Sequence, residues 1–90
     1  MNEQQIEKEI IAIIADVSGF EEDEITLDTK LGEELEIDSI KAIEITVAIE
    51  KKFKVSVRDE DVPKITTVRQ SVDLVNQLLN LPSPNVEAKQ

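Results

Sequence analysis

The 90-residue sequence contains no cysteine and no histidine. Without cysteine, the chain has no disulfide, no thiolate metal site and no thiol nucleophile of its own. Without histidine, it lacks the commonest general base and the commonest metal ligand. A serine in this chain therefore has no histidine to activate it as a hydrolytic nucleophile.

Aromatic residues are almost absent, because Phe20 and Phe53 are the only two. Proteins that bind single-stranded nucleic acid stack the bases on aromatic side chains, and this chain has no such platform. The core must be aliphatic, and one domain of this length is near the lower limit for a self-sufficient core. No apolar run approaches the length of a membrane span.

The net charge of −10 is distributed unevenly. Residues 1–38 contain thirteen acidic and two basic residues, for −11, whereas residues 39–90 contain seven acidic and eight basic residues, for +1. An acidic surface argues against partners such as nucleic acid or anionic membranes. We therefore expect a soluble, cytoplasmic monomer.

Helical spacing of apolar residues predicts the first helix at about residues 3–17. Asn2 is suited to cap it, and Gly19 fits the left-handed residue that ends such a helix. A second helix is predicted from Ser39 to Phe53, with three lysines near its negative C-terminal end.

The rest of the chain predicts one short and one longer helix. Pro63 limits the acidic segment around residues 59–61 to one or two turns. Thr67 and Gln70 form a T-x-x-Q capping box that opens a last helix, which runs to about residue 79. Residues 81–90 lack apolar periodicity, so we expect a disordered tail after a domain of residues 1–80.

Residues 20–37 form a long acidic connection between the first two helices. Its leucine and isoleucine residues are spaced so that the segment is expected to lie against the core, and a loop of this length indicates a function or an extra turn. Three main helices, one short helix and this loop predict an all-α fold, a small antiparallel four-helix bundle.

The helix of residues 39–53 has two apolar stripes. One stripe is an ordinary core face, formed by Ala42, Ile45, Ile49 and Phe53. The other contains Ile40, Ile43 and Val47 and is flanked by Glu44, Glu50 and Lys51. This second stripe is either covered by a neighbour such as the short helix or forms a contact surface for partners.

Ser39 stands at the start of this helix, where unpaired N–H groups and the positive end of the dipole favour a phosphate. A serine at such a position is usually only a cap. Here Asp38 can serve as the cap, which leaves the hydroxyl of Ser39 free to be modified by another enzyme.

Over about residues 3–80, the sequence resembles the acyl carrier protein family. The resemblance is carried by Asp38-Ser39-Ile40 and by the lead-in to the last helix at residues 64–68, together with the helix positions Glu44, Ile45, Ile49, Glu50 and Phe53. It implies a four-helix bundle with a 4'-phosphopantetheine arm, which a phosphopantetheinyl transferase moves from coenzyme A to the serine matching Ser39. The arm ends in a thiol that holds acyl groups as thioesters, so the chain itself needs no catalytic residue. Enzymes that load and process the acyl group are the other partners implied.

Two departures from the family pattern are visible. The glycine that the family often has two residues before its serine is replaced by Ile37-Asp38, preceded by Glu36. The family's acidic partner face is interrupted by Lys41 and Arg58. We interpret the chain as a free-standing carrier for a specialised lipid or polyketide pathway, or as an aminoacyl or peptidyl carrier of the same fold.

Other readings use the abundance of acidic residues. A calcium-binding loop would need oxygen ligands at positions where residues 21–36 have Ile25 and Leu27. An acid–base enzyme would need two carboxylates in distinct environments, and nothing in the sequence marks such a pair. The remaining alternative is an acidic adaptor protein, and it differs from a carrier in that Ser39 would stay unmodified.

Overall fold

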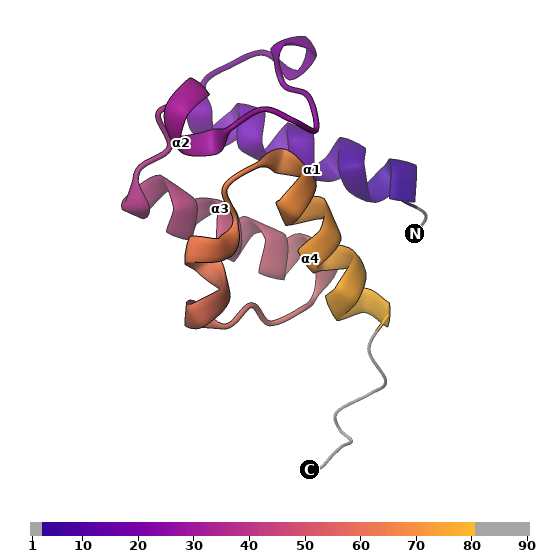
Figure 1. Ribbon diagram of the computed structural model, residues 1–90. Helices are drawn as coiled ribbons and strands as arrows, with labels where there is room; N and C mark the ends of the chain where they lie inside the picture. The colour runs from indigo at the N-terminus through magenta and orange to yellow at the C-terminus, as the bar shows by residue number, and fades with distance from the viewer. Residues whose placement is uncertain (1–2, 81–90) are drawn as a thin grey trace.

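The computed structural model describes residues 3–80. The expected cap at Asn2 and the expected tail of residues 81–90 lie outside the described residues. The elements follow one another in the order drawn in Figure 1: α1 (Glu3–Ser18), η1 (Glu22–Glu24), α2 (Leu31–Glu34), α3 (Ser39–Phe53), η2 (Asp59–Lys64) and α4 (Val68–Asn80).

The chain folds as the small helical bundle that the sequence predicts. The long helix α1 packs against both α3 and α4, and η2 packs against α3. Helices α1 and α3 run in opposite directions (Figure 1). Between residues 3 and 80 there is no strand, only a single bridge between Lys30 and Thr67. Within the same range, every helix is too short or too polar to cross a lipid bilayer.

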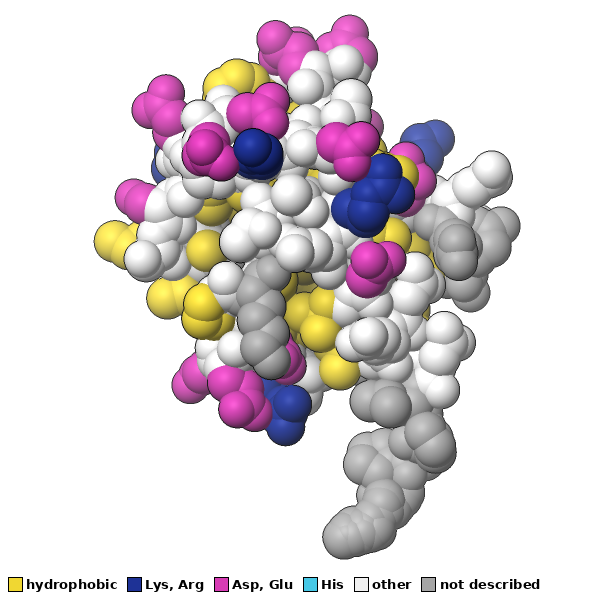
Figure 2. All heavy atoms as spheres, in the orientation of Figure 1, with side chains coloured by type: hydrophobic (Ala, Val, Ile, Leu, Met, Phe, Trp, Pro, Cys, Tyr) yellow, Lys and Arg dark blue, Asp and Glu magenta, His cyan; other side chains and the backbone are white. Residues whose placement is uncertain are grey.

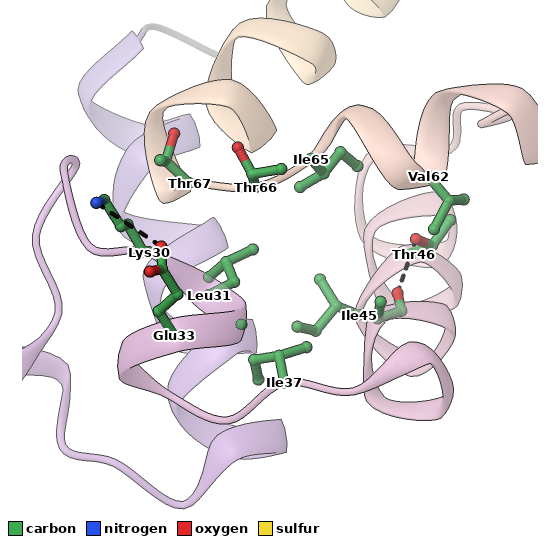
Figure 3. Close-up of a pocket in the computed structure, with 12 residues that line it drawn as sticks. Lys30, Leu31, Glu33, Ile37, Ile45, Thr46, Val62, Ile65, Thr66 and Thr67 are labelled. Carbon is green, nitrogen blue, oxygen red and sulfur yellow. Dashed lines mark hydrogen bonds and ion pairs between the residues drawn. The ribbon is translucent and has the colours of Figure 1, made fainter.

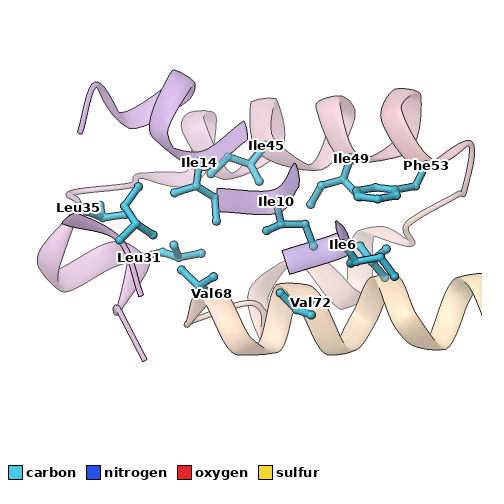
Figure 4. Close-up of a cluster of buried hydrophobic side chains, with 12 residues drawn as sticks. Ile6, Ile10, Ile14, Leu31, Leu35, Ile45, Ile49, Phe53, Val68 and Val72 are labelled. Carbon is cyan, nitrogen blue, oxygen red and sulfur yellow. The ribbon is translucent and has the colours of Figure 1, made fainter. Parts of the chain in front are cut away.

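The core is aliphatic apart from one aromatic ring, that of Phe53. Helices α1, α3 and α4 each contribute one apolar stripe, and Leu31 of α2 and Leu35 directly after it close one end of the cluster (Figure 4). The buried apolar side chains are Ile6, Ile10, Ile14, Ile25, Leu31, Leu35, Ile45, Ile49, Phe53, Val68, Val72 and Val75. The predicted core stripe of α3 is therefore confirmed at Ile45, Ile49 and Phe53, while Ala42 is only half-buried.

The helix boundaries agree closely with those expected from the sequence. Helix α3 occupies the predicted residues, and α1 and α4 each extend one residue further. Gly19 follows α1 with φ of +83°, the left-handed conformation that ends a helix. The capping box of α4 is also formed: the Thr67 N–H donates to Gln70 Oε1 over 3.0 Å, and the Gln70 N–H donates to Thr67 Oγ1 over 3.3 Å.

The connection between α1 and α3 is more ordered than a simple loop. It contains the two short helices η1 and α2, and it is hydrogen-bonded to the start of α4 over about forty residues of sequence. Three backbone bonds make this junction: Arg69 N–H to Leu27 O (2.8 Å), Val68 N–H to Thr29 O (3.2 Å) and Leu31 N–H to Thr66 O (2.9 Å). An exposed ion pair between Arg69 and Asp28 lies beside them at 3.0 Å. We refer to these contacts as the loop–α4 junction.

Replacing Gln70 by alanine should destabilise the bundle. Its Oε1 atom accepts hydrogen bonds from the Thr66 N–H, the Thr66 hydroxyl and the Thr67 N–H at the edge of the loop–α4 junction. Loss of a helix cap costs about 0.5–2 kcal/mol, and we expect Gln70→Ala to reduce the free energy of unfolding by that amount. Urea unfolding followed by far-UV circular dichroism measures it. The control Gln77→Ala, at an exposed position of the same helix, should change stability much less, and equal losses would contradict the capping role.

Candidate functional site

Ser39 is the first residue of α3, and its side chain is exposed. The preceding residue, Asp38, has extended backbone angles and caps the helix: its Oδ1 accepts a 2.8 Å hydrogen bond from the Lys41 N–H. Among residues 3–80, no group makes a hydrogen bond with the hydroxyl of Ser39. The structure thus places the cap on Asp38 and leaves the serine hydroxyl accessible, as the sequence predicts.

The environment of Ser39 favours an anion. The first turn of α3 contains no acidic side chain, and the backbone N–H groups of Ser39 and Ile40 have no acceptor within the described part of the chain. Unpaired N–H groups and the positive end of a helix dipole together stabilise a bound phosphate. A phosphate ester at Ser39 would therefore lie where the helix attracts negative charge.

The backbone that leads into Ser39 makes a sharp turn at Glu36. This residue has φ of +56°, a conformation that costs a non-glycine residue roughly 1–2 kcal/mol. The turn is held by its neighbours, because Leu35 is buried and the Ile37 N–H donates to Leu31 O over 3.0 Å. Glu36 is thus held in a conformation that glycine would adopt more easily.

Two neighbouring hollows lie near the serine. Ser39 lines an open depression of about 530 Å³ between the start of α3 and η2. A second pocket of about 360 Å³ lies between α2, α3 and η2 and has mostly aliphatic walls, with Leu31, Ile45 and Ile65 pointing into it (Figure 3). The two hollows share three lining residues, Ile37, Ala42 and Val62. No pattern in the sequence indicates this pocket, since it depends on how η2 packs against α3.

The second apolar stripe of α3 is exposed to solvent. Ile40, Ile43 and Val47 are 69%, 56% and 40% exposed, and the neighbouring Glu44 is exposed as well. Figure 2 shows hydrophobic side chains at the left edge of the molecule, over the start of α3, while acidic side chains gather over the loop above it. Helix η2 therefore leaves most of this stripe uncovered, and the exposed apolar group is a candidate contact surface.

The other predicted partner residues lie in different settings. Lys41 is half-buried and lies about 100° around α3 from Ile40. The carboxylate of Glu50 accepts a 2.8 Å hydrogen bond from the Val57 N–H, so it supports the connection after α3. Arg58 lies before η2 and pairs with Glu60 at 3.1 Å and with Asp61 at 3.5 Å. The structure does not gather these three residues onto the exposed stripe.

Comparisons with known proteins identify the family. Residues 8–75 match the protein family described as "Phosphopantetheine attachment site". An acyl carrier protein from Petrotoga mobilis is 35% identical over 81 residues, which is 90% of this chain and 95% of that protein. The chain belongs to the acyl carrier protein family.

Other relatives agree with this assignment. An acyl carrier protein from Rickettsia bellii is 40% identical over 72 residues, which cover 80% of this chain and 89% of that protein. The solved structure of the acyl carrier protein from Enterococcus faecalis superimposes with a TM-score of 0.74 at 28% identity, covering 87% of this chain and 99% of that one. The carrier fold is thus shared along nearly the whole described chain.

The prosthetic group of this family is a covalently attached 4'-phosphopantetheine. The residues present fit it: Ser39 offers an accessible hydroxyl, the start of α3 favours the phosphate, and aliphatic walls lie alongside. When bound, the group supplies a terminal thiol, which a chain without cysteine lacks. Membership in the family also implies contact with a phosphopantetheinyl transferase and with biosynthetic enzymes.

Proposed function

We propose that this protein carries acyl intermediates as thioesters on a 4'-phosphopantetheine arm joined to Ser39, and that it is a carrier with no catalytic residue of its own. The observation that supports Ser39 most directly is its accessible hydroxyl behind the Asp38 cap. Attachment forms the bond between Ser39 Oγ and phosphorus and breaks the pyrophosphate bond of coenzyme A, which releases adenosine 3',5'-bisphosphate, while the transferase removes the serine proton. No base for that proton is needed in this chain.

The residues around Ser39 have separate tasks in this proposal. Asp38 fixes the start of α3, and the free N–H groups of Ser39 and Ile40 stabilise the phosphate. Ile40, Ile43 and Val47 meet the partner enzyme beside the attachment point. The aliphatic pocket between α2, α3 and η2 gives an acyl chain a place away from water, reached through the lining shared at Ala42.

We further propose that the carrier works in the cytoplasm in a specialised lipid or polyketide pathway, with an aminoacyl or peptidyl pathway as the second candidate. The support is the surface charge of α3, where Lys41, Lys51 and Lys52 outnumber Glu44 and Glu50. An enzyme surface built for an acidic helix would be repelled by this one, which is specificity by exclusion.

The attachment site is tested by intact mass. Incubation with coenzyme A and a broad-specificity phosphopantetheinyl transferase should add one phosphopantetheine group to the wild type and to Ser56→Ala, a control at an exposed serine outside the helices. Ser39→Ala should show no mass increase while its circular dichroism spectrum stays that of the wild type. If no transferase modifies the wild type, the carrier proposal is wrong and the protein is instead an unmodified acidic adaptor.

The partner surface is tested by a pair of isoleucine substitutions on α3. Ile43→Ala removes a 56% exposed side chain, so stability should change by less than about 1 kcal/mol, whereas Ile49→Ala removes one that is 1% exposed and should cost about 2–5 kcal/mol. Transferase kcat/KM should fall about fivefold for Ile43→Ala, the loss of roughly 1 kcal/mol of apolar contact. It should be unchanged for folded Ile49→Ala. A large stability loss at Ile43 would instead make the exposed stripe part of the core.

The pathway proposal is tested with a type II ketosynthase from fatty-acid synthesis. We expect slow turnover of the loaded wild type and faster turnover of Lys41→Asp and Arg58→Glu, because the substitutions remove repulsion from a basic docking surface. The gain should shrink at high salt, where exposed charges are screened over about 8 Å or less. Full turnover of the wild type, unaltered by either change, would indicate a general fatty-acid carrier.

A further inference from the structure

Within residues 3–80, two lysines at the end of α3 have no acidic partner. Lys51 and Lys54 are both exposed, and neither forms an ion pair with any described residue. Lys52, which lies between them in the sequence, differs because it pairs with Glu9 of α1 at 3.4 Å. The acidic surplus of the protein precedes Ser39 in the sequence, and of those acids only Glu9 pairs with a lysine of α3 within the described residues.

The exposed apolar stripe and Lys51 share one face of α3. Residues at spacings of four, seven and eleven return to the same side of an α-helix. Lys51 follows Val47 by four residues and Ile40 by eleven, so it continues their line. With a rise of about 1.5 Å per residue, Lys51 lies about 18 Å along the helix from Ser39. Lys54 is three residues further on, directly after the last residue of α3, and its left-handed backbone ends the helix.

The acids of α3 do not offset this charge. The only acidic residues of helix α3 are Glu44 and Glu50. The Glu50 carboxylate accepts a hydrogen bond from the Val57 N–H. The carboxylates near the exposed stripe include Glu44 on α3 and Asp59 of η2, which lines the depression beside Ser39 and Ile43, at the serine end of the helix. The outward face is thus apolar near the serine and basic at its far end.

The lysines also complement the negative end of the helix dipole, as lysines in a last turn usually do. Stabilisation of the helix dipole accounts for one positive charge at the end of α3. Lys52, which pairs with Glu9 of α1, already supplies that charge. The dipole does not explain why two further lysines stand unpaired in line with an exposed apolar stripe.

We infer that α3 docks on an enzyme whose surface has carboxylates about 18 Å from the opening that receives the arm, with an apolar patch between them. This inference rests on the proposed function, because it uses the attachment of the arm at Ser39. Lys51 and Lys54 pair with the carboxylates, and Ile40, Ile43 and Val47 cover the apolar patch. The docking surface of the partner enzyme is thus acidic. Its charge is opposite to that of an enzyme surface that receives an acidic helix.

The test is a charge swap with a defined probe enzyme. A type II ketosynthase is used in two forms, one native and one in which the lysines and arginines of its carrier-docking surface are replaced by glutamate. The carriers are the wild type, Lys51→Glu/Lys54→Glu, and the control Lys8→Glu/Lys89→Glu, which has the same net charge but alters a lysine of α1 and one outside the described residues. Each is loaded first, and loading and folding are verified by intact mass and by the thermal unfolding midpoint.

The wild type should react with the acidic ketosynthase about three- to tenfold faster in kcat/KM than with the native form, the factor expected for two exposed ion pairs. The Lys51→Glu/Lys54→Glu variant should reverse this preference, and the control should keep it. If all three carriers load efficiently and share the same preference between the two ketosynthase forms, the inference about Lys51 and Lys54 is wrong, while the proposed function stands. Failure of the wild type to load would overturn the proposed function and the inference with it.

Discussion

Backbone hydrogen bonding at the start of α4 is the constraint on which the rest of the bundle depends. A helix begins with N–H groups that its own turns do not satisfy. In this protein, two of them are taken by carbonyl groups of the long loop, and the capping box takes two more. The loop, in return, gains partners for backbone that would otherwise lie unpaired against the core. Each segment is therefore ordered by the other.

The position of the serine follows from this exchange. The loop–α4 junction fixes residues 27–31, and buried Leu31 and Leu35 hold α2 against the core. Only a short turn then separates α2 from Ser39. The left-handed backbone of Glu36 is tolerated there because the flanking leucine and isoleucine contacts determine the path of the chain. Placement of the attachment site is thus a result of tertiary packing as well as of the local Asp-Ser sequence.

Sequence reasoning succeeded where a single local rule controls the outcome. Apolar spacing defined α1, α3 and α4, glycine chemistry placed Gly19, and the T-x-x-Q pattern placed the start of α4. The division of roles between Asp38 as cap and Ser39 as free hydroxyl also follows from local preferences. The spacing further separated the buried and exposed stripes of α3, although it did not decide whether a neighbour covers the second one.

Features that depend on distant segments were not predictable in the same way. The four-residue α2 and the three-residue η1 are too short for a periodic signal. The loop–α4 junction joins residues about forty positions apart, and the aliphatic pocket requires α2, α3 and η2 to be in place together. The hydrogen bond between Glu50 and the Val57 N–H likewise removes from the exposed stripe a carboxylate that helical spacing alone would assign to it.

The contact between α1 and α4 has a consequence for the synthesis of this protein on the ribosome. Helix α1 is made first, yet one of its main packing partners is the last helix of the described chain. Until α4 emerges, Ile6 and Ile10 lack part of their cover and the loop lacks its hydrogen-bond partners. Contacts that close such long stretches of chain form late, because the entropy of closure must be overcome first. The nascent chain therefore completes its bundle only once α4 has left the ribosome, and the serine acquires its fixed setting at the start of α3 only then.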